Sequence, residues 1–240
     1  MTQATYLERR GKIEHYFDRT AADTWARLTS TAPVSGIRAT VRAGRDRMRS
    51  TLLGWLPEDL RGRRLLDAGC GTGALAVEAA LRGAKVVAID LSPTLVQVAR
   101  ERLPVHLRPE EAGSDGGSVT FHSGDMLDAG LGSFDHVVCM DSLIHYRAGD
   151  IVDALGRLAA RTSTSIVFTF APSNPLLATA ITVGRLFPRG DRAPFIEPVA
   201  ERKLRSRIAG AAAMTDWTAT DTQRIKSGFY TSQAMRLVHA

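Results

Sequence analysis

Short apolar runs alternate with amphipathic stretches between residues 64 and 170. The apolar runs predict strands at 65–68, 85–89, 119–122, 135–140 and 165–170, and the stretches between them predict helices at 74–82, 92–103 and 150–161. This alternation is typical of parallel βαβ units, in which helices cover both faces of one sheet. Two further strand-like runs, 217–225 and 228–238, predict an antiparallel pair that closes a seven-stranded, mostly parallel sheet. We therefore expect an α/β fold of the Rossmann-like kind.

A helical segment precedes this alternation, and it carries two stripes of residues at helical spacing. The apolar stripe consists of Ile37, Val41, Gly44, Met48, Leu52 and Trp55. A stripe of arginines lies beside it, roughly 100° around the helix, and consists of Arg38, Arg42, Arg45 and Arg49. Such a stripe is usually a solvated face. Because it borders the apolar stripe, it also suits a site that binds an amphipathic anion.

The regular alternation stops after residue 170. Residues 171–215 hold an apolar helix-like stretch and a basic run at 202–207, which predict an insertion that caps the sheet. We therefore expect a helical N-terminal segment, residues 1–60, and one α/β domain, residues 61–240, with the cap inserted after its fifth strand.

The formal net charge of +6 suggests an anionic partner, namely nucleic acid, a membrane surface or an acidic small molecule. The charge is unevenly spread, because residues 1–64 carry +6, residues 65–170 carry −5 and residues 171–240 carry +5. A plainer alternative is compositional bias, since 27 of the 31 basic residues are arginine. The partition of the charge therefore says more about the partner than the total does.

The apolar runs of the chain are short. None reaches the roughly 18 residues of a membrane span, and the first residues do not resemble a signal peptide, so we expect a cytoplasmic protein. Cys70 and Cys139 lie in separate strand-like stretches, which predicts free thiols in a reducing compartment.

The most informative segment is a strand that runs into a glycine turn, Leu65-Leu66-Asp67-Ala68-Gly69-Cys70-Gly71-Thr72-Gly73. Glycine is needed where the backbone bends sharply and meets a ligand without a Cβ atom in the way. The spacing G-x-G-x-G differs from the G-x-G-x-x-G of dinucleotide-binding loops, and Asp67 would repel a pyrophosphate but attract an ammonium group. A phosphate-binding P-loop is excluded as well, because no Gly-Lys-Ser/Thr follows.

This segment resembles motif I of the class I S-adenosylmethionine-dependent methyltransferases, and the resemblance continues through the next three strands. It implies that Asp67 helps to hold the methionine ammonium, that Asp90 accepts the ribose hydroxyls and that Asp125 accepts the adenine amino group. The cofactor contacts implied in this way are Asp67, Gly69, Gly71, Gly73, Asp90, Leu91, Asp125, Met126 and Met140. The acidic middle of the chain suits S-adenosylmethionine, whose sulfonium and ammonium outnumber its one carboxylate.

The segment after the fourth strand, Met140-Asp141-Ser142-Leu143-Ile144-His145-Tyr146, points to the class of substrate. Enzymes that methylate nucleobase amines tend to carry Asn/Asp-Pro-Pro-Tyr/Phe there, and the chain has no RNA-binding module, so we expect no nucleic-acid partner. Together with Tyr16-Phe17, Trp25, 34–38, 41–45 and 168–172, the segment resembles the magnesium-protoporphyrin O-methyltransferases of bacteriochlorophyll synthesis. That family esterifies one propionate of magnesium-protoporphyrin and releases S-adenosylhomocysteine.

The resemblance implies roles for four side chains. His145 is the candidate catalytic residue and also a substrate contact, because it follows the fourth strand, where cofactor and substrate should meet. Tyr16 is expected to act as a lid over the cofactor, and thus as both a catalytic and a cofactor-binding residue. Arg38 and Arg42 are expected to bind the propionates. No metal site is expected, because the histidines are scattered without a metal-ligand spacing.

The sequence leaves alternatives open for the substrate and for the roles of single residues. The same cofactor motifs also suit an O- or C-methyltransferase that acts on a quinone precursor or another hydrophobic acid, or a regulatory protein that binds the cofactor without catalysis. His145 and Tyr16 each have a plainer reading, as a structural histidine and as a core aromatic residue. The basic flanks leave open peripheral contact with a membrane. A magnesium chelatase subunit is a further candidate partner, on which the sequence itself is silent.

Overall fold

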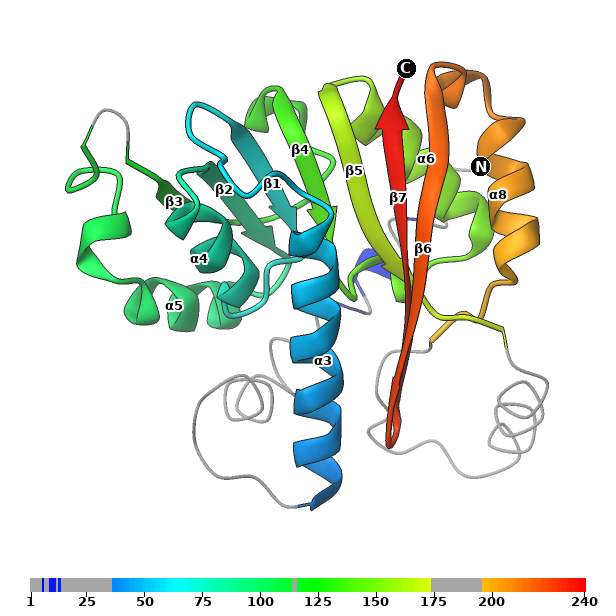
Figure 1. Ribbon diagram of the computed structural model, residues 1–240, viewed down its shortest axis with the longest axis horizontal. Coiled ribbons are helices and arrows are strands. Elements are labelled where there is room, and N and C mark those ends of the chain that lie inside the picture. The colour runs from blue at the N-terminus through cyan, green and yellow to red at the C-terminus, as the bar shows by residue number, and fades with distance from the viewer. Residues whose placement is uncertain (1–5, 7–8, 12, 14–35, 114–115, 174–195) are drawn as a thin grey trace.

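One seven-stranded sheet organises the molecule (Figure 1). The computed structural model describes residues 6, 9–11, 13, 36–113, 116–173 and 196–240. The strands are β1 Arg64–Ala68, β2 Lys85–Asp90, β3 Ser118–Ser123, β4 Phe134–Cys139, β5 Thr162–Phe170, β6 Trp217–Ser227 and β7 Tyr230–His239. Their order across the sheet is β3-β2-β1-β4-β5-β7-β6, and β7 runs antiparallel to both β5 and β6. The predicted α/β fold with a mostly parallel sheet is confirmed.

Helices cover both faces of this sheet, as the sequence predicts. The longer helices are α3 Gly36–Gly54, α4 Ala74–Leu81, α5 Pro93–Arg102, α6 Ala148–Ala159 and α8 Glu201–Ala209. Short 3-10 turns lie at η1 Val105–Leu107, η2 Ala129–Leu131, η3 Leu143–His145 and η4 Ala212–Met214. Helices α3, α4 and α5 share one buried core with the sheet, whereas α6 and α8 share the core on the opposite face.

The two cores follow from the period of two along each strand, which sends neighbouring side chains to opposite faces. In β1, Leu65 joins the core with α3 and α4, while Leu66 joins the core with α6. In β5, Val167 and Phe168 divide in the same way. Because both faces are covered, these central strands read as continuous apolar runs in the sequence.

The strand β5 begins three residues before the sequence predicts. Its first residues, Thr162, Ser163 and Thr164, are polar, and hydrophobic patterning alone does not mark them as a strand. Thr162 nevertheless pairs with Phe134 of β4, so the sheet extends the strand to this point.

The predicted cap has a described part and a part that lies outside the described residues, 174–195. Helix α8 and η4 pack against α6, so they form a layer of the α/β domain and do not cover the cavity described below. The basic run at 202–207 belongs to α8, where Arg205 bonds to Glu201 and to the carbonyl oxygen of Ala219. The division into an N-terminal segment and a capped domain stays a prediction.

Helix α3 lies against the hairpin formed by β6 and β7, and glycines permit the close approach. A Cβ atom on Gly44 would come within 2.6 Å of Tyr230, and one on Gly228 within 2.3 Å of the Thr40 hydroxyl. The apolar stripe of α3 is buried at Met48 and Leu52. The helix therefore brings one side of the arginine stripe to the start of β7.

Candidate active site

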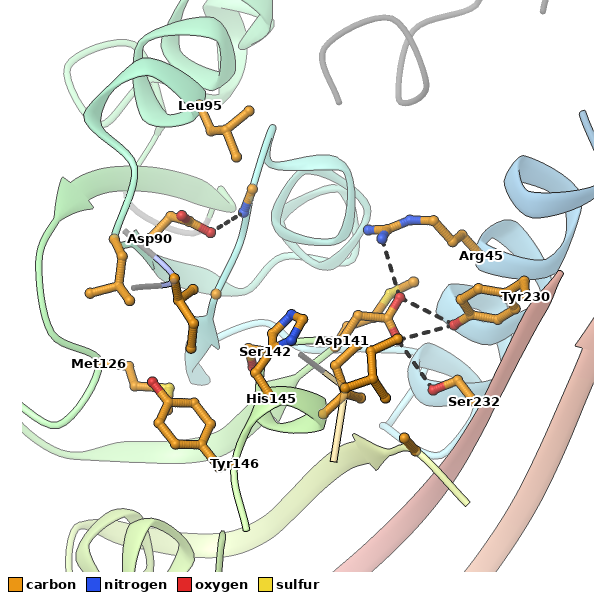
Figure 2. A pocket seen from close by; sticks show the side chains of 18 of the residues that line it. Arg45, Asp90, Leu95, Met126, Asp141, Ser142, His145, Tyr146, Tyr230 and Ser232 are labelled. Atoms are coloured by element: carbon orange, nitrogen blue, oxygen red, sulfur yellow. Dashed lines mark hydrogen bonds and ion pairs between the residues drawn. The ribbon is translucent and has the colours of Figure 1, made fainter. Parts of the chain in front are cut away.

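A cavity of about 290 Å³ opens beyond the carboxyl ends of the central strands, in the size class of small-molecule sites. Its described lining comes from the glycine loop, the ends of β2 and β4, helix α3 and the start of β7. Figure 2 shows Asp90 and Leu95 on one side, Arg45, Tyr230 and Ser232 gathered around Asp141 on the other, and His145 between them. Parallel α/β sheets bind ligands at this edge.

The glycine loop between β1 and α4 forms the floor of one end of the cavity. Gly69, Gly71 and Gly73 have φ angles of 88°, 53° and 79°, in the left-handed region that favours glycine. A Cβ atom on Gly69 would lie 2.4 Å from Cβ of Ser142, while one on Gly71 would meet nothing within 4 Å. Gly71 therefore offers bare backbone to a ligand, and Gly69 packs the loop against the segment after β4.

Asp90, the last residue of β2, fixes the loop and faces the cavity. Its Oδ2 accepts a hydrogen bond of 2.8 Å from the Gly71 amide, and its Oδ1 accepts one of 3.0 Å from the Ser92 amide. Burial raises the pKa of Asp90, although these amides oppose the rise. A carboxylate fixed by two amides at the strand end is well placed to accept ligand hydroxyl groups.

Asp67 lies beneath the loop and outside the described lining of the cavity. It is buried, and its Oδ2 atom has no hydrogen-bond partner among the described residues. Burial, with a smaller contribution from Asp90, raises the pKa of Asp67 to about 7. A buried carboxyl with an unsatisfied oxygen beside a glycine loop fits a cationic ligand, because a nearby positive charge favours its ionised form.

This environment predicts pH-dependent cofactor binding. Below pH 7 the cofactor-free protein holds Asp67 neutral, whereas a bound ammonium group favours the carboxylate, so binding releases a proton there. We expect the cofactor to bind about tenfold more weakly at pH 6 than at pH 8, as measured by isothermal titration calorimetry. Asp67→Asn should flatten this dependence, and a variant that keeps the wild-type slope would show that Asp67 is not the titrating group.

Asp125 follows β3, and both of its carboxylate oxygens have partners within the chain. The Tyr6 hydroxyl donates to Oδ1 over 2.7 Å, and Arg10 pairs with Oδ2 over 3.1 Å. Tyr6 also stacks on Tyr146, with ring centroids 5.3 Å apart. Asp125 is not among the described lining residues, although Met126 is. The contact of Asp125 with adenine stays a prediction. It requires a carboxylate oxygen of Asp125 either to accept a second hydrogen bond or to give up its bond to Tyr6 or Arg10.

The segment after β4 places His145 at the junction of the two ends of the cavity. His145 ends the 3-10 turn η3, is 8% exposed as a residue and lines the cavity. Arg9 donates to the His145 carbonyl oxygen over 2.7 Å and pairs with Glu197. The Glu197 amide also donates to the carbonyl oxygen of Ile144, so two segments distant in sequence hold the backbone at His145 in place.

Asp141 forms a polar cluster on the side of the cavity away from the glycine loop. Its Oδ2 pairs with Arg45 over 3.2 Å, and its oxygens accept hydrogen bonds from the hydroxyls of Tyr230 and Ser232. The backbone of Asp141 has a φ of 56°, an uncommon conformation for a residue other than glycine. Such backbone strain persists where surrounding contacts fix it, and it is common at functional sites.

The structure brings together only part of the predicted site. The cavity lining includes Gly69, Gly71, Asp90, Leu91, Met126, Met140 and His145. Gly73 lies outside the described lining; it is the N-cap residue of α4 and packs against Phe121. Tyr16 lies outside the described residues. Arg38 and Arg42 lie outside the described lining, which Arg45 of the same stripe joins instead.

Sequence reasoning missed five residues of this site, namely Tyr6, Arg45, Asp141, Tyr230 and Ser232. Asp141 stands within the informative segment after the fourth strand, and Arg45 stands within the arginine stripe, so a signal existed for these two. No sequence signal marks Tyr230 and Ser232, because their position depends on where β7 enters the sheet.

The strand order, the glycine loop at the end of β1 and the carboxylate at the end of β2 define a class I S-adenosylmethionine-dependent methyltransferase. The family model described as "Methyltransferase domain" matches residues 65–164, and the one described as "Magnesium-protoporphyrin IX methyltransferase C-terminus" matches residues 139–239. The chain is 48% identical over 231 residues to magnesium-protoporphyrin O-methyltransferase of Rhodobacter capsulatus, covering 96% of each chain. It therefore belongs to the magnesium-protoporphyrin O-methyltransferase family.

Two further comparisons support this membership. Magnesium-protoporphyrin O-methyltransferase of Synechocystis is 30% identical over 190 residues, which cover 78% of this chain and 79% of the relative. The crystal structure of magnesium protoporphyrin IX methyltransferase from Synechocystis with bound SAH (S-adenosylhomocysteine) has a TM-score of 0.78 and 26% identity, and covers 96% of this chain and 99% of that one. Ubiquinone biosynthesis O-methyltransferase of Xanthomonas oryzae is 35% identical over 147 residues, but these cover only 58% of this chain and 59% of the relative.

Proposed function

We propose that the protein transfers the methyl group of S-adenosylmethionine to one propionate carboxylate of magnesium-protoporphyrin IX, in bacteriochlorophyll biosynthesis. The products are the monomethyl ester and S-adenosylhomocysteine. The observation that carries the proposal is a single cavity that joins the glycine loop to a wall with apolar side chains and the Arg45 guanidinium. Such a wall suits the edge of an apolar macrocycle that carries carboxylates.

The chemistry requires orientation more than proton transfer. S-adenosylmethionine supplies, when bound, a methyl group on a positively charged sulfur, which keeps the electron pair of the broken C–S bond as the substrate oxygen forms the new C–O bond. A propionate is already ionised near pH 7, so the chain needs no strong general base. Asp90 and the backbone at Gly71 would hold the cofactor, and Asp67 would favour its ammonium. His145 would orient the reacting carboxylate, and Tyr16 would cover the cofactor as a lid.

The direct test is an incubation of the purified protein with S-adenosylmethionine and magnesium-protoporphyrin, followed by chromatography and mass spectrometry. We expect a product in which one methyl group replaces a carboxyl proton, and an equal amount of S-adenosylhomocysteine. A parallel incubation with a polyprenyl-phenol quinone precursor addresses the second candidate, which the partial similarity to ubiquinone biosynthesis enzymes favours. Methylation of the quinone precursor without methylation of the porphyrin would refute the proposal.

Two partner predictions extend this function. Peripheral contact with a membrane would help to load an apolar substrate, and it is supported by the basic flanks and by Phe229, which is 80% exposed at the tip of the β6–β7 hairpin and also lines the cavity. Among the described helices, none combines the length and apolar character that crossing a bilayer demands. A magnesium chelatase subunit remains the predicted protein partner, because it would supply the metallated porphyrin.

A further inference from the structure

Charged side chains are distributed unevenly around the cavity. Its described lining contains two carboxylates, Asp90 and Asp141, and one guanidinium, that of Arg45. Asp90 lies at the end of the cavity that the glycine loop forms, here called the cofactor end. Its carboxylate accepts hydrogen bonds there from the amides of Gly71 and Ser92. Arg45 lies with Asp141 on the other side, beyond His145 (Figure 2). A substrate with two carboxylates therefore meets different groups at two places along this cavity.

The cluster around Asp141 keeps Arg45 in one position. The Arg45 side chain is 20% exposed and pairs with Asp141, whose own side chain is 7% exposed. Asp141 is fixed in turn by two hydroxyls of β7 and by Thr169 of β5, which accepts a hydrogen bond of 2.7 Å from the Asp141 amide. Arginine suits such a position, because its planar guanidinium can bind one carboxylate while it presents other N–H groups to a second.

A cation in this position is better suited to a carboxylate that does not react. As methyl transfer proceeds, the attacking carboxylate loses its negative charge and becomes a neutral ester. A guanidinium bound to that oxygen would stabilise the reactant more than the transition state, and would slow the reaction. Bound to the other propionate, whose charge does not change, the same guanidinium adds affinity and orientation at no such cost.

We propose, on the basis of the proposed function, that Arg45 binds the propionate that is not methylated and that Asp141 positions Arg45 for this task. The arrangement limits the reaction to one methyl transfer. A monomethyl ester could react again only by turning over, which would place its neutral ester group against Arg45 and its remaining carboxylate at the cofactor. The loss of the charged contact makes this second orientation unfavourable.

The test compares two ligands that differ only in the charged groups. Binding of magnesium-protoporphyrin and of its dimethyl ester is measured by difference absorption titration, with wild type, Arg45→Gln and Arg49→Gln. Arg49 is a matched control, because it lies one turn further along α3 and pairs with Glu78 and Asp46 outside the described lining. We expect Arg45→Gln to weaken binding of the dicarboxylate about 10- to 100-fold and to change binding of the dimethyl ester less than threefold.

Equal weakening of both ligands in Arg45→Gln would show that Arg45 is only structural, and unchanged binding of the dicarboxylate would also overturn the proposal. A second readout is the product. Arg45→Gln should form dimethyl ester on prolonged incubation, whereas wild type and Arg49→Gln should stop at the monomethyl ester. Arg45→Lys keeps the charge and should restore most of the preference for the dicarboxylate.

The two proposals fail in different ways. If wild type forms no methyl ester of the porphyrin, the proposed function fails, and the titrations still decide whether Arg45 binds a carboxylate. If wild type forms the monomethyl ester and Arg45→Gln forms no dimethyl ester and keeps its preference for the dicarboxylate, the role of Arg45 fails alone.

Discussion

Asp90→Ala is expected to raise the Kd for S-adenosylmethionine by about 100-fold or more. The substitution removes an acceptor that suits two ligand hydroxyls, and charge-assisted hydrogen bonds contribute about 1.5–3 kcal/mol each. It also releases the Gly71 amide, which the carboxylate fixes at 2.8 Å. Both effects act on the cofactor end of the cavity and not on the wall formed by α3. Isothermal titration calorimetry with S-adenosylmethionine measures the result.

A matched control for this substitution exists in the same sheet. Asp135 of β4 also accepts a backbone amide, that of Arg64, over 2.8 Å, but it is not part of the described lining of the cavity. Asp135→Ala should leave the Kd for S-adenosylmethionine within about twofold of wild type. Unchanged affinity in Asp90→Ala would refute the contact assigned to Asp90, and thermal unfolding without cofactor would show whether either variant is unfolded.

His145→Ala is expected to lower kcat by about 100-fold, in the lower part of the range for a positioned catalytic side chain. The Kd for S-adenosylmethionine should change less than threefold, because Asp90 and the glycine loop remain in place. The backbone at His145 should also remain fixed, since Arg9 bonds to its carbonyl oxygen and not to its ring. Steady-state kinetics with saturating cofactor separates kcat from KM.

His122→Ala serves as the control for this variant, because His122 is exposed on β3 and is not part of the described lining. Its kinetics should equal those of wild type. If His145→Ala also turns over at the wild-type rate, His145 is a structural residue that fills the junction. If kcat falls and the Kd for S-adenosylmethionine rises by a similar factor, the imidazole ring supports the cofactor end and does not orient the substrate.

The predicted site residues that the structure brings to the cavity are marked by local sequence patterns. The glycine loop and Asp90 each lie at the end of a strand that the apolar pattern marks, and parallel strands bring these ends to one edge. Arg45 shows the limit of this reasoning. It shares a stripe with Arg38 and Arg42, and the choice among the three depends on where the hairpin crosses α3, near Gly44.

Tyr230 and Ser232 show a second limit. Both stand at the start of β7, which enters the sheet between β5 and β6. That order leaves β5 alone between them and β4, and they bond to Asp141, which follows β4, across about 90 residues of sequence. Hydrophobic periodicity predicts the strand itself, but it carries no information on which neighbours the strand will have.

The bonds of Asp141 to Arg45 of α3 and to two hydroxyls of β7 join segments that the ribosome synthesises at different times. Most of the residues that form the cofactor end lie between Gly69 and Met126. Their strands are neighbours in the sheet, because β2 pairs with both β1 and β3. The wall around Arg45 requires Tyr230 and Ser232, which follow Met126 by about 100 residues in the sequence. Synthesis from the N-terminus therefore delivers the first strands of the cofactor end well before the residues that complete the substrate wall.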